Sequence, residues 1–184
     1  MPESYMARKP AVVIVTCSDQ RRNDALKAFT DELETQGYTT YTVRQPGGAL
    51  QYARAFWFVV ALQLRVFLKK GALYLYLENH PDCAGLAYLR DSVRERHSLR
   101  QRGIVDETSH HMFVLQRAAG RMARAAWFDG YDIEVAYQLA DDPDAPIIID
   151  GNGPFPKGST QLNRQSLSLR HRLKRRRLES ASAD

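Results

Sequence analysis

The chain has 184 residues, of which 44% are hydrophobic and 26% are charged, and its formal net charge is +5. This length suffices for one domain with a hydrophobic core, whereas the longest apolar stretch, Ala55 to Leu64, is too short to cross a bilayer. The two cysteines are too few for a disulfide framework, and the first ten residues lack the apolar core of a signal peptide, so we expect a cytoplasmic protein with cysteines that are thiols or metal ligands.

The positive charge is concentrated at the carboxyl terminus. Residues 157–184 contain eight Lys and Arg residues and two acidic residues, so the rest of the chain has a formal charge of −1. The same segment is rich in polar residues and poor in apolar ones, which is typical of a flexible tail. We therefore predict a folded domain over residues 1–156 and a basic tail over residues 157–184 that could contact a polyanionic partner.

The pattern of apolar residues predicts alternating strands and helices. The first strand is an unbroken β-branched run, Val12 to Val15, as expected for a strand covered on both faces. The helix after it has three apolar residues at helical spacing and a glycine at its end. In chain order we predict a strand over 12–15, a helix over 23–36, a strand over 38–43, a helix over 50–69, a strand over 72–77, helices over 85–99 and 109–128, and strands over 131–139 and 146–149. This order predicts an α/β fold with a mostly parallel sheet flanked by helices.

Polar side chains follow the first strand directly. Cys17, Asp19 and Arg21 are spaced two residues apart just beyond the apolar run. In open α/β sheets, ligands bind at the carboxyl ends of the parallel strands. These three residues are therefore candidates for a site.

A second polar group follows the third predicted strand and contains His80 and Cys83. Together with Cys17 they offer two thiolates and one imidazole, a ligand set that suits Zn²⁺ and leaves a fourth position for water or a carboxylate. Asp19 is the nearest candidate for that position. Arg21 could hold Asp19 in an ion pair and keep it ionised and turned away from the metal.

Taken singly, these residues allow other interpretations. A cysteine at the end of a strand can be a buried packing residue, and the two cysteines could form a disulfide or a redox pair. The zinc interpretation is favoured because both cysteines of the chain follow predicted parallel strands, each with polar companions.

The two motifs together resemble those of the β-class carbonic anhydrases. The signature Cys-x-Asp-x-Arg of that family is similar to Cys17–Arg21, and its His-x-x-Cys signature is similar to His80–Cys83. Between them, Arg44–Ala49 resembles the family's arginine and glycine-containing turn, and Tyr131–Ile133 resembles its late strand. The resemblance covers residues 11–150.

The chain also departs from the family at identifiable positions. The family commonly has glycine on both sides of the His-x-x-Cys motif, where this chain has Asn79 and Ala84. Only ten residues precede Ala11, where the first apolar run begins, so the resemblance does not extend to the helical arm that wraps a partner in many members.

The resemblance implies a β-carbonic-anhydrase-like fold, a homodimer or larger homo-oligomer, and zinc-dependent reversible hydration of CO₂ to bicarbonate. Zinc would make hydroxide available near neutral pH, Asp19 would accept its hydrogen bond, and Arg21 would fix Asp19. Gly47 and Gly48 could offer backbone donors near the substrate. Three histidines could relay protons, although we expect them at the surface: His97, His110 and His111.

Two other functions are compatible with the same residues. One is a zinc-stabilised scaffold without activity that binds nucleic acid or an acidic protein through the basic tail. The other is an enzyme that hydrolyses a related linear substrate, COS or CS₂. Asp19 and Arg21 favour catalysis over the scaffold, because a structural zinc site needs neither residue.

Overall fold

The computed structural model describes residues 9–54, 57–90, 93–128, 130–142, 144–149, 151 and 153–162. The strands are β1 (Ala11–Cys17), β2 (Thr39–Gln45), β3 (Ala72–Asn79), β4 (Glu134–Leu139) and β5 (Thr160–Gln161). The α-helices are α1 (Asn23–Thr35), α2 (Leu50–Arg54), α3 (Trp57–Leu68), α4 (Ala84–Arg90), α5 (Val93–Gln101) and α6 (Glu107–Phe128), and a 3₁₀ turn covers Gln20–Arg22.

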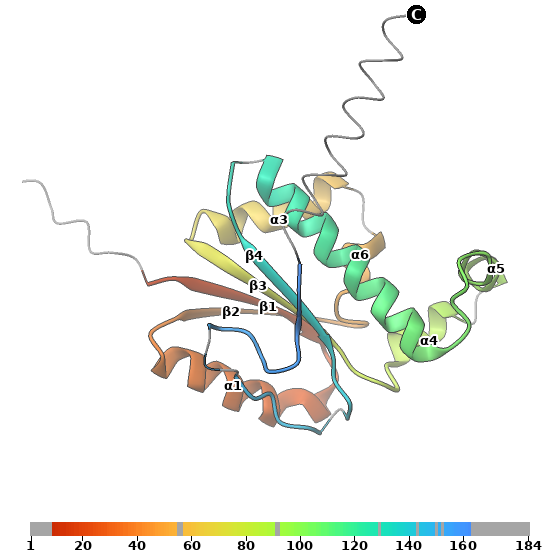
Figure 1. Cartoon of the computed structure of the whole chain (residues 1–184), viewed down its shortest axis with the longest axis horizontal. Coiled ribbons are helices and arrows are strands. Elements are labelled where there is room, and N and C mark those ends of the chain that lie inside the picture. Colours follow the sequence, from red (N-terminus) through yellow and green to blue (C-terminus); the bar gives the residue numbers. More distant parts are fainter. Residues whose placement is uncertain are drawn as a thin grey trace, which may run out of the picture.

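The strands form one sheet in the order β2-β1-β3-β4-β5. β1 pairs in parallel with β2 and β3, and β4 pairs in parallel with β3, whereas β5 is antiparallel to β4. Helix α1 covers one face of the sheet, and α3 and α6 cover the other (Figure 1). The predicted α/β fold with a mostly parallel, helix-flanked sheet is confirmed.

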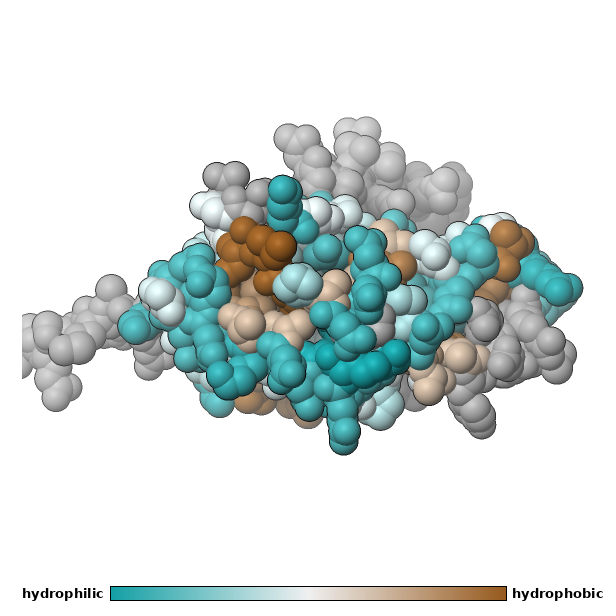
Figure 2. Space-filling view, turned by 90° about the horizontal axis from the view of Figure 1, so that it is seen from below, coloured by the Kyte–Doolittle hydropathy of each residue, from teal (hydrophilic) through white to brown (hydrophobic). Residues whose placement is uncertain are grey.

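The central strand β1 is buried along its whole length, because it lies between β2 and β3 and helices cover both faces of the sheet (Figure 1). Val13 and Val15 belong to the larger core, which includes residues of α2, α3 and α6. Val12 and Ile14 point the other way and pack with the apolar face of α1, which consists of Leu26, Phe29 and Leu33. The surface of the molecule on the α1 side is largely hydrophilic (Figure 2). The β-branched run therefore predicted its environment correctly.

The last predicted strand is wrong. Residues 146–149 form only an isolated bridge, between Ile149 and Pro156, and Ile148 is exposed. The edge of the sheet beside β4 is instead occupied by the two residues of β5, and the amide of Leu162 donates to the carbonyl of Val135. The last strand thus lies beyond residue 156, where we expected the tail to begin, while residues 163–184 lie outside the described part.

The described parts of two long predicted helices are helical. The segment 50–69 contains α2 and α3 on either side of residues 55–56, and the segment 85–99 lies over α4 and α5 on either side of residues 91–92. Among the helices in the described ranges, none combines the length and apolar character needed to cross a bilayer.

A buried ion pair, which the sequence did not reveal, joins the 3₁₀ turn before α1 to the end of β3 and to the loop after β4. The Nε and Nη2 atoms of Arg22 donate to the carboxylate oxygens of Glu78, each at 2.9 Å, and both side chains are at most 3% exposed. Arg22 Nη1 also donates to the carbonyl of Ala145 at 2.8 Å. Burial raises the pKa of Glu78, and Arg22 and the hydroxyl of Tyr76 oppose this rise. The pair therefore fixes Glu78, two residues before His80.

Removing one partner of this pair should be strongly destabilising. We expect Arg22→Met to lower the free energy of unfolding by about 3–5 kcal/mol, because it leaves a buried carboxylate without its partner. Urea denaturation would measure this loss, and the double variant Arg22→Met/Glu78→Gln should recover much of it. Lys27→Met, which removes an exposed ion pair with Asp31, is the control. Equal losses in R22M and K27M would contradict the prediction.

Candidate metal centre

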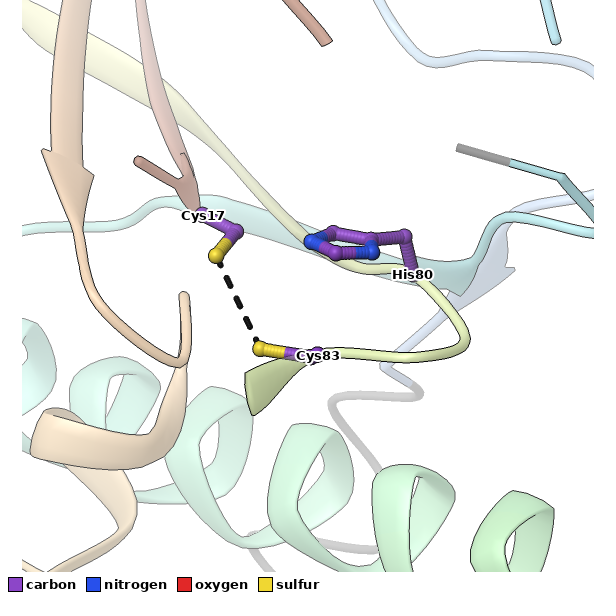
Figure 3. Close-up of side chains that lie close together, drawn as sticks. All are labelled: Cys17, His80 and Cys83. Carbon is purple, nitrogen blue, oxygen red and sulfur yellow. Dashed lines mark hydrogen bonds between the residues drawn. The ribbon is translucent and has the colours of Figure 1, made fainter. Parts of the chain in front are cut away.

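Two neighbouring parallel strands bring Cys17, His80 and Cys83 together. Cys17 is the last residue of β1, His80 follows β3 directly, and Cys83 immediately precedes α4. One possible ligand atom from each of the three residues lies within 4.8 Å of the other two, and the two sulfur atoms are 3.6 Å apart. The three side chains point toward one another (Figure 3). The predicted metal-binding residues therefore do form one cluster.

The imidazole of His80 is oriented for a ligand. Its Nδ1 lies 2.7 Å from the carbonyl oxygen of Pro81, to which it donates, so the lone pair is on Nε2. Nε2 is buried and has no hydrogen-bond partner among the described residues. An unsatisfied buried polar atom costs roughly 1–3 kcal/mol. A metal ion between Nε2 and the sulfurs would satisfy it.

The two cysteines have opposite pKa shifts because they share a buried contact. The neighbouring Cys83 lowers the pKa of Cys17 below its usual value, with His80 and nearby backbone amides adding to the effect. The same contact raises the pKa of Cys83, and burial raises it further. One thiolate is thus stable within the pair, and a cation would stabilise the second, as metal binding requires deprotonated sulfur. The three residues could together hold a metal ion.

Asp19 lies at the margin of this cluster as an ionised group. Arg21 Nη2 donates to Asp19 Oδ2 at 2.8 Å, and the backbone amide of Arg21 donates to Oδ1 at 3.0 Å. These bonds lower the pKa of Asp19 to about 2. Asp19 Oδ2 is 3.8 Å from Nε2 of His80, and Arg44 Nη2 donates to the backbone carbonyl of Asp19 at 2.9 Å. Arg21 and Arg44 therefore hold the side chain and the backbone of Asp19.

The turn with Gly47 and Gly48 packs tightly against the end of β3. Both glycines have positive φ, 76° and 53°. A Cβ on Gly48 would lie 2.5 Å from Asn79 Oδ1 and 2.8 Å from the carbonyl oxygen of Glu78, so only glycine fits there. The amide of Gly48 donates to the carbonyl of Gln45 within the turn, and the backbone of Gly47 is among the groups that lower the pKa of Cys17. The two glycines thus serve the turn and the thiolate.

The two departures from the family's glycines are accommodated without crowding. Asn79 is buried, and its Oδ1 accepts a hydrogen bond from the amide of Ala49 at 3.2 Å. Ala84, the first residue of α4, is exposed. The close approach is made instead by Gly85, where a Cβ would lie 2.8 Å from the amide nitrogen of Gly47.

Two of the three histidines that we considered as proton relays are not where we expected them. His97 is exposed, but His110 and His111 on α6 are 2% and 1% exposed, because this helix packs against the sheet. His111 Nε2 is 3.4 Å from Glu107 Oε1. Burial lowers the pKa of His111, with His110 and His80 also lowering it while Glu107 opposes the shift.

The comparisons with known proteins concern the fold. No protein-family model matches the chain, and no curated protein matches it. Among solved structures, beta-carbonic anhydrase isoform I from Trichomonas vaginalis is similar, with a TM-score of 0.44 and 14% identity over 82% of this chain and 80% of that chain. A tetrameric beta-carbonic anhydrase from Sordaria macrospora has a TM-score of 0.44 and 14% identity, over 72% and 77% of the two chains. A carbonic anhydrase from Streptococcus mutans has a TM-score of 0.36 and 18% identity, over 84% of each chain. The TM-scores of these three structures are all below 0.5 and their identities are at most 18%.

If Cys83 is a metal ligand, Cys83→Ser should abolish stoichiometric metal binding. We expect one metal ion per wild-type chain, and we expect the variant to lose the metal and melt at a lower temperature, because binding contributes to folding. Elemental analysis and calorimetry would measure both quantities. Ser18→Ala, an exposed change beside Cys17, is the control. Full stoichiometry in C83S would remove Cys83 from the ligand set.

Gly48→Ala should destabilise the protein by more than its positive φ alone explains. Gly37→Ala is the matched control, because Gly37 has a φ of 91° but nothing within 4 Å of an added Cβ. We expect roughly 1 kcal/mol of destabilisation in the control, and a larger loss in Gly48→Ala because the new methyl meets Asn79 and Glu78. Chemical denaturation of both variants would show the difference, and equal losses would argue against tight packing at this turn.

Proposed function

We propose that the chain is a zinc-dependent carbonic anhydrase that catalyses the reversible hydration of CO₂ to bicarbonate. The observation that carries the proposal is an ionised carboxylate beside a Cys-His-Cys cluster: Asp19 Oδ2 lies 3.8 Å from His80 Nε2 and is paired with Arg21. A metal site that only stabilises a fold has no need of such a carboxylate.

The ligand assignment follows from the donor atoms. Cys17 and Cys83 would bind zinc through Sγ, and His80 would bind it through Nε2. A zinc ion with three protein ligands acts as a Lewis acid and lowers the pKa of water in its fourth position to about 7. Gly47 would stabilise the thiolate of Cys17 through its backbone amide.

The role of Asp19 follows from its ionisation. A carboxylate can only accept hydrogen bonds, so Asp19 would accept a hydrogen bond from the attacking water. This bond would leave a lone pair of the water oxygen directed at the carbon of CO₂. Arg21 would keep Asp19 ionised and in place. Arg44 would fix the backbone at Asp19, since it donates to the carbonyl of that residue.

Self-association is part of the proposal. Leu62 and Val66 on α3 are 65% and 51% exposed, although they are one helical turn apart and apolar. Neighbouring exposed apolar side chains of this kind are typical of contact surfaces. A homodimer or larger homo-oligomer would bury them.

Replacing the carboxylate of Asp19 should separate catalysis from metal binding. We expect Asp19→Asn to keep zinc and to lose CO₂ hydration by a factor on the order of 10² or more, because the amide can donate and is a weaker acceptor. Stopped-flow hydration assays with zinc analysis would measure this, with Asp31→Asn as an exposed control. Turnover near wild type would remove the role of Asp19.

The same assay distinguishes the other candidate functions. Zinc-loaded wild-type protein that hydrolyses COS or CS₂ but does not hydrate CO₂ would support the related substrate. Zinc-loaded protein that acts on none of the three would support the scaffold.

A further inference from the structure

The loop from His80 to Cys83 supplies two of the three candidate ligands, and the first turn of α6 holds it. The backbone amide of Asp82 donates to Glu107 Oε1 at 3.1 Å. Asp82 has a φ of 57°, in the left-handed region that glycine, Asn and Asp adopt more readily than other residues. Glu107 therefore anchors the loop at the turn residue that directly precedes Cys83.

His111 lies one helical turn after Glu107 and contacts the same oxygen. Its Nε2 is 3.4 Å from Glu107 Oε1, so this oxygen is placed between the helix side chain and the loop amide. His111 is 1% exposed, and its Nδ1 is buried without a hydrogen-bond partner. A buried nitrogen without a partner costs free energy, so an apolar side chain would be more favourable if this position served packing alone. The contact with Glu107 gives this buried polar side chain a role that an apolar residue could not have.

We propose that Glu107, supported by His111, is a positioning residue that fixes the His80–Cys83 loop and thereby raises the affinity of the cluster for metal. Glu107 contacts the amide of Asp82, the residue directly before Cys83. Holding this amide limits the freedom of Cys83 Sγ and keeps His80 Nε2 close to the sulfurs. Polar groups that orient metal ligands in this way typically change metal affinity by about 10- to 100-fold. The inference rests on the proposed metal site.

The chain offers a matched control at the neighbouring position. Asp106 caps α6, because Oδ1 accepts from the amide of Ser109 and Oδ2 accepts from its hydroxyl, both at 2.7 Å. Asp106→Ala would therefore weaken the same end of the same helix while leaving the contact between Glu107 and Asp82. A loss of metal affinity that comes only from fraying of α6 would appear in both variants.

The test measures zinc dissociation constants by competition with a chelator, using the full chain. We expect Glu107→Ala to weaken zinc binding by about 10- to 100-fold, and Glu107→Gln to restore part of it, because its amide oxygen can accept from Asp82. Asp106→Ala should stay within about threefold of wild type. Hydrogen exchange at the amide of Asp82 should be faster in E107A and not in D106A. Equal zinc affinity in wild type and E107A, or equal losses in E107A and D106A, would overturn the inference.

A second pair of variants keeps the test decisive if Glu107→Ala does not fold. His111→Leu removes the ring that contacts Glu107, while His111→Gln keeps a donor near the position of Nε2. Weaker zinc binding in H111L than in H111Q supports the inference, and equal binding contradicts it. Zinc-loaded wild type without CO₂ hydration would refute the proposed function while leaving these affinity comparisons in force.

Discussion

The parallel pairing of β1 with β3 is the constraint on which the site depends. Their register places Val15 beside Leu77, so Cys17 and Asn79 end the two strands side by side. Parallel strands end at the same edge of a sheet, and here this edge holds two thiols and an imidazole within 4.8 Å. The core positions them because a slip of β1 by one residue would exchange the side chains that pack in the two cores, Val13 and Val15 on one face and Val12 and Ile14 on the other.

Around this edge, the polar residues at the end of β3 contact different partners. Glu78 is buried with Arg22 on the α1 side of the sheet. Asn79 accepts from Ala49 on the other side, beside Gly48. The backbone before the imidazole is therefore held from both faces. This support has a physical reason. A ligand group that is already in position loses little conformational entropy when a metal binds, so binding is stronger.

The electrostatics of the site are asymmetric. The deep part of the cluster contains sulfur atoms that favour a cation, whereas its margin carries the ionised Asp19. Arg21 neutralises much of that charge and also restricts the geometry of the carboxylate. Cys17 and Cys83 would thus hold a metal from the buried side of the cluster, and Asp19 would offer a hydrogen-bond acceptor at its margin. Such an acceptor distinguishes this cluster from one that consists of sulfur and imidazole ligands alone.

The sequence by itself determined β1, α1 and the three residues of the Cys-His-Cys cluster. Runs of β-branched residues and helical spacing are local signals, and polar groups directly after two parallel strands must meet at one edge. Only the tertiary structure decided the contacts between distant segments. Arg22 and Glu78 are 56 positions apart, and the contact of Glu107 with Asp82 requires α6 to dock on the loop. The last strand is likewise formed by Thr160–Gln161. Which segment occupies the edge beside β4 depends on which one can reach it in the folded chain, and a local sequence pattern does not determine this.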